Sequence, residues 1–151
     1  MNLAPESETP VDCVTFMLLK DGSVLSERRK VTKTVAPGAV ALPGGHIEPG
    51  ECPESALDRE LLEELGVTAV TPLYVCTLLH RAEEFRKVYY FAILEWEGRI
   101  SNMEADNLSW LPLTELDRLN LDVDRVAVNE YLRVYRPTEV SPLLSPDVHL
   151  A

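Results

Sequence analysis

Three shortages in this sequence narrow the class of protein. No stretch approaches the roughly 20 consecutive apolar residues that a membrane-spanning helix needs. The first ten residues, MNLAPESETP, are polar and acidic, unlike a secretory signal. The three cysteines are widely separated, form no C-x-x-C pair, and show no zinc-ligand spacing to the three histidines. We therefore expect a cytoplasmic protein with no membrane partner, no disulfide framework and no zinc site.

Positive charge is also scarce. Lysine and arginine together number 14 against 25 aspartates and glutamates, for a net charge of −11. A protein that binds a nucleic acid polymer should present a basic face, so no such partner is expected. If the ligand is a phosphorylated small molecule, something other than net charge must attract it. A divalent cation is the obvious candidate.

The chain of 151 residues, 46% hydrophobic and 26% charged, has the size and composition of one globular domain. We expect a flexible N-terminal arm over residues 1–10 and a domain over residues 11–136. A proline-containing C-terminal segment over residues 137–151 would form a tail or a docked extension.

Several segments have the residue types of strands. A hairpin is predicted from Val11 to Arg29, with its turn at Asp21 to Ser23. A short strand in AVALPGG should lead into a glycine turn. Further strands are predicted at Thr71 to His80, Val88 to Gly98 and Ser109 to Leu113, the first two joined by the charged connection RAEEFRK.

Two helices have start or periodicity signals. Pro53 suits a first helical position and Gly66 a C-terminal stop, although Cys52 stands where Ser or Asp would normally cap. Asp122 to Tyr135 has apolar residues at helical spacing, and Thr114 to Leu119 predicts a short turn or helix. Strands on both sides of a helix, with another helix at the end, predict an α/β or α+β sandwich around a mixed β-sheet.

The first helix carries an unusual concentration of carboxylates. Glu60, Glu63 and Glu64 fall within an arc of roughly 100° beside an apolar stripe, and Arg59 can neutralise only one of them. Such a cluster either has raised pKa values or binds a metal. Oxygen ligands without histidine or cysteine favour magnesium, manganese or calcium. Charge counting alone leaves a solvated acidic helix equally reasonable.

The spacing of residues before and along this helix decides between a metal site and a solvated acidic helix. Gly45, five residues, Glu51, seven residues and then RELLEELGV reproduce G-x5-E-x7-R-E-U-x-E-E-x-G-U, where U is aliphatic. Every fixed position of the Nudix box is present, so the chain resembles the Nudix hydrolase family. The resemblance implies an α/β/α sandwich around a mixed sheet and hydrolysis of a nucleoside diphosphate linked to another group.

The resemblance also implies roles for individual residues. Glu60, Glu63 and Glu64 would hold Mg²⁺, with Mn²⁺ as a substitute and the Gly44 carbonyl as an additional ligand. Arg59 would orient a glutamate, and Glu51 would support the loop. Glu104 fits the further carboxylate that the family often supplies before a Trp-bearing strand, with Asp106 as a rival. The general base remains open between Glu104 and the box glutamates.

The box does not specify the substrate. The window Arg81 to Phe85 lacks the proline or tyrosine typical of subgroups for ADP-sugars and dinucleoside polyphosphates. By elimination the chain is similar to MutT-type enzymes, which release pyrophosphate from (d)NTPs or oxidised (d)NTPs. Another pyrophosphate substrate, such as a nucleotide sugar, and a non-catalytic nucleotide-sensing domain are the alternatives. A homodimer is common in the family.

Substrate contacts are predicted outside the box. Arg28, Arg29 and Lys33 are candidates for binding phosphates, although a solvated strand end explains the two arginines equally well. Asp124, with its neighbour Asp122, either reads a purine edge or caps the last helix. Of the aromatic residues in strands, at most one is expected to stack on a base; the candidates are Tyr74, Tyr89, Phe91 and Trp110.

Overall fold

The computed structural model of this chain describes residues 8–135. The predicted tail over residues 137–151 and most of the predicted N-terminal arm therefore lie outside the described residues. Among residues 8–135, no helix is both long and apolar enough to cross a bilayer.

A seven-stranded mixed sheet forms the centre of the fold. Its strands run in the order β3-β2-β1-β7-β6, with β4 paired to β1 and β9 to β2. The pair β1 and β7 is parallel, and the other pairs of this sheet are antiparallel. The bounds are β1 (Val11–Lys20), β2 (Ser23–Arg28), β3 (Val40–Ala41), β4 (Gly44–His46), β6 (Leu73–Arg81), β7 (Phe85–Ile93) and β9 (Asn107–Pro112).

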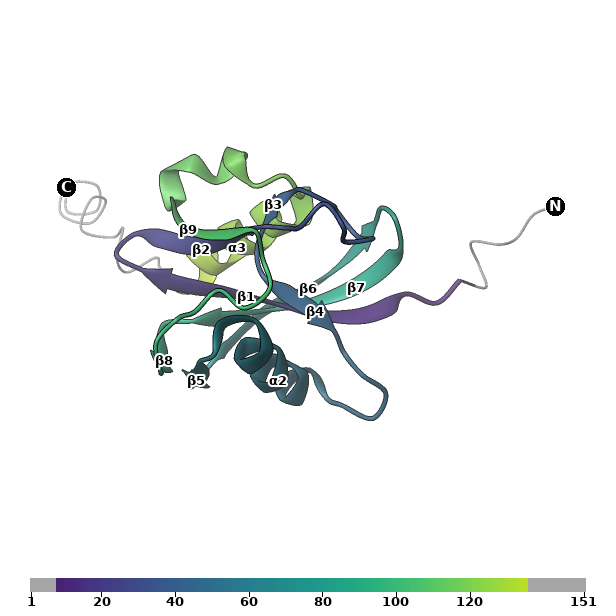
Figure 1. The fold of residues 1–151 in the computed structure, drawn as a ribbon, viewed down its shortest axis with the longest axis horizontal. Helices are drawn as coiled ribbons and strands as arrows, with labels where there is room; N and C mark the ends of the chain where they lie inside the picture. The colour runs from purple at the N-terminus through teal and green to yellow at the C-terminus, as the bar shows by residue number, and fades with distance from the viewer. Residues whose placement is uncertain (1–7, 136–151) are drawn as a thin grey trace, which may run out of the picture.

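Helices cover both faces of this sheet. Helix α2 (Pro53–Leu65) lies on one side and α3 (Asp122–Tyr135) on the other, with the 3-10 helix η1 (Leu113–Arg118) preceding α3 (Figure 1). The predicted α/β/α sandwich around a mixed sheet is thus confirmed. Both long helices occupy their predicted residues, because a proline start, a glycine stop and a helical apolar period are local signals.

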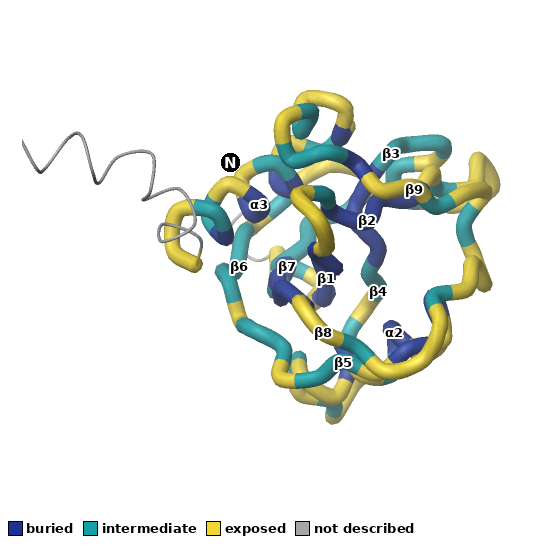
Figure 2. The backbone as a smooth tube through the Cα atoms, turned by 90° about the vertical axis from the view of Figure 1, so that its left-hand side faces the viewer, coloured by how far each residue is buried: buried dark blue, intermediate teal, exposed yellow. Residues whose placement is uncertain are grey.

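Strand β1 is buried on both faces, which explains its long apolar run. Alternate side chains point to opposite sides of the sheet and enter two different cores. Cys13, Met17 and Leu19 pack into the core under α3, whereas Val14, Phe16 and Leu18 pack into the core under α2. Figure 2 shows the buried backbone of β1 and β7 in the middle of the molecule.

Three predicted segments differ from the structure. Gly44 and Gly45 do not form a turn but lie in β4, which pairs with β1. The predicted strand Val88 to Gly98 is two strands, because the chain bends at Leu94 and β8 (Glu95–Glu97) pairs with β5 (Thr68–Val70) in a separate two-stranded sheet. Neither partner strand is adjacent in the sequence, so only long-range pairing reveals these breaks. The charged connection is also shorter than predicted, since β6 reaches Arg81 and β7 begins at Phe85.

The two ends of α2 differ in their capping hydrogen bonds. At the C-terminus, Gly66 adopts a left-handed conformation with φ of 72°, and its N–H donates to the Leu61 carbonyl at 3.0 Å. At the N-terminus, Cys52 has the extended conformation of a cap, with φ −88° and ψ 164°, but its side chain makes no capping hydrogen bond. Helix α2 therefore begins without one of its usual stabilising contacts.

Replacing Cys52 by Ser should therefore stabilise the protein. A serine hydroxyl in this backbone conformation accepts a hydrogen bond from the first turn of the helix, which contributes about 0.5–1 kcal/mol. The measurement is the free energy of unfolding in urea, with Cys76→Ser as the control away from the helix terminus. Equal or lower stability of the Cys52→Ser variant would contradict the prediction.

Candidate active site

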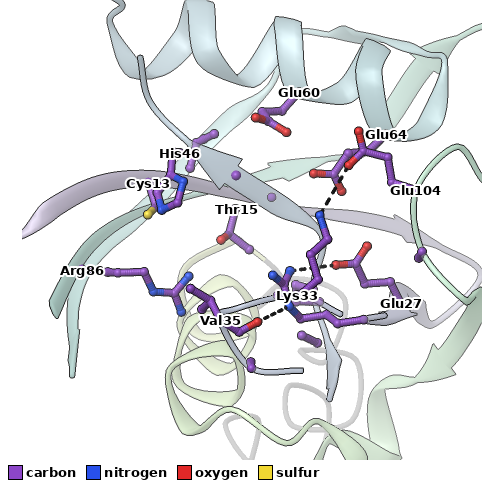
Figure 3. A pocket seen from close by; sticks show the side chains of 18 of the residues that line it. Cys13, Thr15, Glu27, Lys33, Val35, His46, Glu60, Glu64, Arg86 and Glu104 are labelled. Atoms are coloured by element: carbon purple, nitrogen blue, oxygen red, sulfur yellow. Dashed lines mark hydrogen bonds and ion pairs between the residues drawn. The ribbon is translucent and has the colours of Figure 1, made fainter. Parts of the chain in front are cut away.

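A cavity of about 410 Å³ lies beside α2 and the strands β1 and β2. Its walls come from β1, β2, β4, α2, β7 and α3, together with the loop that follows β2 and the loop before β9 that carries Glu104. In Figure 3, Glu60 and Glu64 project into the cavity from α2, while Glu27 and Lys33 lie across from them. Segments far apart in the sequence thus supply one concave site.

Four carboxylates converge in this cavity, and we call them the carboxylate cluster: Glu27, Glu60, Glu64 and Glu104. Glu60 and Glu64 are buried, with exposed fractions of 8% and 7%. Burial, followed by the charges of the other three members, raises the pKa of Glu64 far above its usual range. Ionising the whole cluster is therefore unfavourable unless a cation joins it.

Glu27 is the member that the sequence analysis missed. It lies inside β2 with an exposed fraction of 6%, and burial raises its pKa to about 6 although Arg29 and Lys33 oppose the shift. Its partner Arg29 approaches with Nη1 3.4 Å from Glu27 Oε2. The sequence offered no clear signal for it, because Glu27 stands between Ser26 and Arg28 at the polar end of the strand SVLSER.

Glu63 and Glu104 are placed differently from the buried pair. Both side chains line the cavity, but each is roughly half exposed. Glu104 approaches Lys33, with Oε1 3.8 Å from Nζ. The predicted rival, Asp106, does not line the cavity, and its backbone N–H donates to the Arg28 carbonyl. The structure thus brings Glu104, not Asp106, to the box glutamates.

Arg59 connects the loop before α2 to the cluster. Its Nε and Nη2 donate to the two carboxylate oxygens of Glu51 at 2.8 and 2.9 Å, a bidentate pair. Its Nη1 donates to Glu60 at 3.0 Å and to Glu63 at 3.2 Å, and Nη2 also donates to the His46 carbonyl at 3.0 Å. The guanidinium thereby orients Glu60 and is itself held by Glu51.

The Glu51–Arg59 pair leads to a prediction about acid stability. Hydrogen bonds from Arg59 lower the pKa of Glu51 from about 4.5 to about 2. A carboxyl group with a lowered pKa contributes stability above its unfolded-state pKa, and this contribution is lost as the pH falls toward the folded-state value. Glu51→Gln should therefore lower Tm at pH 7, and the difference from wild type should shrink between pH 4.5 and pH 2. A Tm difference that stays constant over this range would contradict the assignment.

The two glycines of β4 permit a close approach that no other residue allows. A Cβ on Gly45 would lie 2.3 Å from Glu60 Oε2, and a Cβ on Gly44 would lie 2.2 Å from the Val14 carbonyl oxygen. Gly44 thus lets β4 pair tightly with β1, and Gly45 leaves room for the Glu60 carboxylate. Gly44 thus serves backbone pairing, and Gly45, the first residue of the box, serves carboxylate placement.

The residues present fit a hard divalent cation. The donors that meet at the cluster are carboxylate oxygens, those of Glu27, Glu60 and Glu64 on buried residues, and such oxygens are the ligands that Mg²⁺ and Mn²⁺ take. The Gly45 position, which a side chain would fill, keeps Glu60 beside the backbone of β4. Glu60, Glu63, Glu64 and Glu104, with the Gly44 carbonyl, remain the predicted ligands.

The predicted phosphate contacts separate into two groups. Arg29 and Lys33 line the cavity, and Arg29 Nε donates to the Val35 carbonyl at 2.9 Å. Arg28 does not line the cavity, and its Nη1 donates to the Gly38 carbonyl at 3.0 Å. The alternation of β2, which ends at Arg28 and continues in extended backbone to Arg29, explains the difference, because neighbouring residues of an extended chain point to opposite faces.

Asp124 lies at the base of the cavity and does not serve as a helix cap. It is 2% exposed, and its carboxylate accepts hydrogen bonds from the Leu42 N–H at 3.0 Å and from the Tyr90 hydroxyl at 2.9 Å. Burial raises its pKa to about 6 despite these bonds. The four aromatic candidates do not line the cavity, and Tyr90 does.

The fold and the cluster together define the class: an α/β/α sandwich in which one helix presents carboxylates for a divalent cation to a cavity. The NUDIX domain family model matches residues 9–132, and the chain belongs to this family. This confirms the resemblance drawn from the box.

Relatives of known name agree with this assignment. The 8-oxo-dGTP diphosphatase of Haemophilus influenzae is 31% identical over 52% of this chain and 59% of its own length. The CTP pyrophosphohydrolase of Escherichia coli is 27% identical over 85% of this chain and 98% of its own length. The crystal structure of a MutT NUDIX hydrolase from Burkholderia pseudomallei superposes with a TM-score of 0.74 at 25% identity, covering 82% of this chain and 98% of that one. The chain spans less than two thirds of the first of these relatives.

Proposed function

We propose that this protein is a Mg²⁺-dependent pyrophosphohydrolase that releases pyrophosphate from a (d)NTP or an oxidised (d)NTP. The observation that carries the proposal is the convergence of Glu27, Glu60, Glu64 and Glu104 at one cavity that also contains Arg29 and Lys33. Carboxylates that hold a cation and basic side chains nearby are the two requirements for binding a polyphosphate in an acidic protein. The named activities of the relatives support the same class.

The chain's own residues would act through position and charge. Glu60, Glu63, Glu64 and Glu104 would hold Mg²⁺, and the bound ion would supply positive charge to offset the phosphates and would make a bound water more acidic. Arg59 keeps Glu60 in place through Nη1 and is braced by Glu51. The proton of the attacking water passes to a carboxylate of the site, either Glu104 or a box glutamate.

A substrate panel tests the proposal. Purified protein is assayed with Mg²⁺ against NTPs, oxidised NTPs, nucleotide sugars and dinucleoside polyphosphates, and pyrophosphate is measured as a product. We expect pyrophosphate release to be fastest with a nucleoside triphosphate or its oxidised form. If a nucleotide sugar is hydrolysed fastest, the proposed (d)NTP substrate is wrong. If calorimetry shows tight nucleotide binding and no substrate is turned over, the protein is a nucleotide-sensing domain and not an enzyme.

We also propose a cytoplasmic setting, which the cysteines support. All three cysteines are free thiols, which suits a reducing cytoplasm. A small nucleotide derivative is the partner that the cavity would accept, and a homodimer is proposed only from the family resemblance.

Lys33 provides a test of phosphate binding. Its side chain is 42% exposed and reaches the cavity beside Glu104. Lys33→Met should raise KM about tenfold with a smaller change in kcat, because the lost interaction is made to the bound substrate as well as to the transition state. Lys87→Met is the charge-matched control, since Lys87 lies over the Tyr89 ring and outside the cavity lining. Equal effects of the two variants would show only a change in net charge.

A further inference from the structure

A second group of metal-ligating side chains lies at one side of the cavity. Cys13 comes from β1, His46 from β4, and Glu84 from the hairpin between β6 and β7. One ligand atom from each, the thiol sulfur, an imidazole nitrogen and a carboxylate oxygen, lies within 4.8 Å of the other two. His46 Nε2 and Glu84 Oε1 are already 2.7 Å apart.

The backbone, not the choice of side-chain conformation, brings the first two residues together. Cys13 and His46 are direct partners in the antiparallel pairing of β1 with β4. The strand carrying His46 is fixed at both sides, because its carbonyl accepts from Arg59 Nη2 and the following Ile47 N–H donates to the Asp12 carbonyl at 2.9 Å. Side chains of directly opposed residues in such a pair are close neighbours.

Glu84 is held within reach by its hairpin. The turn between β6 and β7 is short, with the Ala82 N–H donating to the Glu84 carbonyl at 3.2 Å. The side chain is 28% exposed, so it lies against the protein and does not extend freely into water. The hydrogen bond to His46 shows that the hairpin already touches β4.

The donor atoms select a different metal from that of the carboxylate cluster. One thiolate, one imidazole and one carboxylate suit Zn²⁺ and related borderline-soft ions, whereas Mg²⁺ takes oxygen ligands. Three protein ligands leave a fourth tetrahedral position for water or substrate. Figure 3 places Cys13 and His46 on the opposite side of the cavity from Glu64 and Glu104, so the two groups share no residue.

The groups around Cys13 keep its thiol protonated, and this affects metal binding. Burial raises the pKa of the Cys13 thiol to about 11, although the nearby Arg86 guanidinium opposes this shift. A metal ion must therefore displace the thiol proton, as it does at other thiolate sites. The ligand charges, one thiolate and one carboxylate, then offset those of a divalent ion, and the Arg86 guanidinium beside Cys13 adds one further positive charge.

We propose that Cys13, His46 and Glu84 form a binding site for Zn²⁺ or a similar borderline-soft divalent ion, separate from the Mg²⁺ site. An ion there would join β1, β4 and the β6–β7 hairpin at the edge of the nucleotide cavity. The binding itself does not depend on the proposed hydrolase activity.

Cobalt spectroscopy in excess Mg²⁺ tests the site without any substrate. Mg²⁺ occupies oxygen sites but does not compete for thiolate and imidazole ligands. We expect one equivalent of Co²⁺ to produce a thiolate-to-cobalt charge-transfer band in the near ultraviolet and intense visible bands of tetrahedral coordination. Added Zn²⁺ should displace the cobalt and raise Tm through mass action.

Variants assign the signal to these residues. Cys13→Ala should abolish the charge-transfer band, while Cys52→Ala and Cys76→Ala keep it. Glu84→Gln can retain a hydrogen bond to His46 but lacks the carboxylate charge, and its affinity for Co²⁺ should fall at least about tenfold. Glu84 is in a hairpin turn, so this variant tests the site even if Cys13→Ala folds poorly. Absence of the band in wild type, its survival in Cys13→Ala, or unchanged affinity in Glu84→Gln would overturn the proposal.

Discussion

Glu64→Gln should lower kcat by about 10²–10⁴ while leaving the metal-free protein at least as stable as wild type. The loss follows because Glu64 is a predicted ligand and lies at the centre of the carboxylate cluster, where the nucleophile and the developing charge would be handled. The gain or neutrality in stability follows because glutamine has nearly the same shape and is always neutral, whereas Glu64 must take up a proton on folding to be neutral beside Glu27, Glu60 and Glu104. Steady-state kinetics and thermal unfolding in a chelator measure the two effects.

Mg²⁺ gives this prediction a second measurement. An ion that binds only the folded protein raises Tm by mass action, so Mg²⁺ should raise the Tm of wild type and raise that of Glu64→Gln much less. Glu54→Gln is the matched control, because Glu54 is in the first turn of the same helix and is exposed. Its kinetics should stay within about twofold of wild type. Full activity in Glu64→Gln would show that the carboxylate cluster does not have the proposed catalytic role.

Gly45→Ala should abolish most activity in a protein that still folds. The added Cβ would meet the Glu60 carboxylate, with contacts of 2.3 to 2.6 Å to its three terminal atoms. A flexible carboxylate can move away, so the fold survives, but Glu60 then leaves the position in which Arg59 holds it. We expect kcat/KM to fall about 10²-fold or more, with the Mg²⁺ requirement shifted to higher concentration.

Gly44→Ala should fail in a different way. Its Cβ would meet the Val14 carbonyl oxygen and the Thr15 Cα, at 2.2 and 2.8 Å, and backbone atoms of a central strand cannot withdraw. We expect a loss of stability of about 3 kcal/mol or more through separation of β4 from β1. Urea unfolding of both variants, beside their kinetics, separates the two roles. If Gly45→Ala unfolds as readily as Gly44→Ala, Gly45 serves pairing and not carboxylate placement.

Predictions that depend on residues close together in the sequence were confirmed, whereas those that depend on distant partners were missed. The bounds of α2 depend on Pro53 and Gly66, and those of α3 on a periodic apolar pattern, so neighbouring residues suffice to predict them. The break at Leu94 was missed because no glycine or proline stands beside Leu94 to mark it. It exists only because β8 finds β5 as a partner.

The same distinction holds in the candidate site. The Nudix box identified Glu60, Glu63, Glu64, Arg59 and Glu51 as a group, since all belong to one loop and one helix. Glu27 was not predicted as a site residue because it comes from β2, and it reaches the cluster only after β1 and β2 have paired. Arg28 and Arg29 were indistinguishable as sequence neighbours, and the pleat of β2 placed only Arg29 at the cavity.

The sequence by itself determined the family, the sandwich class, and the helix that carries the carboxylates, because each depends on residues close together in the chain. Only the tertiary structure decided which distant groups meet. It placed Glu27 and Glu104 at the cluster, closed the base of the cavity with Asp124, and set Cys13 opposite His46 where their spacing in the sequence indicated no zinc site. The physical reason is that strand register and packing, which no local pattern records, control contacts between residues far apart in the chain.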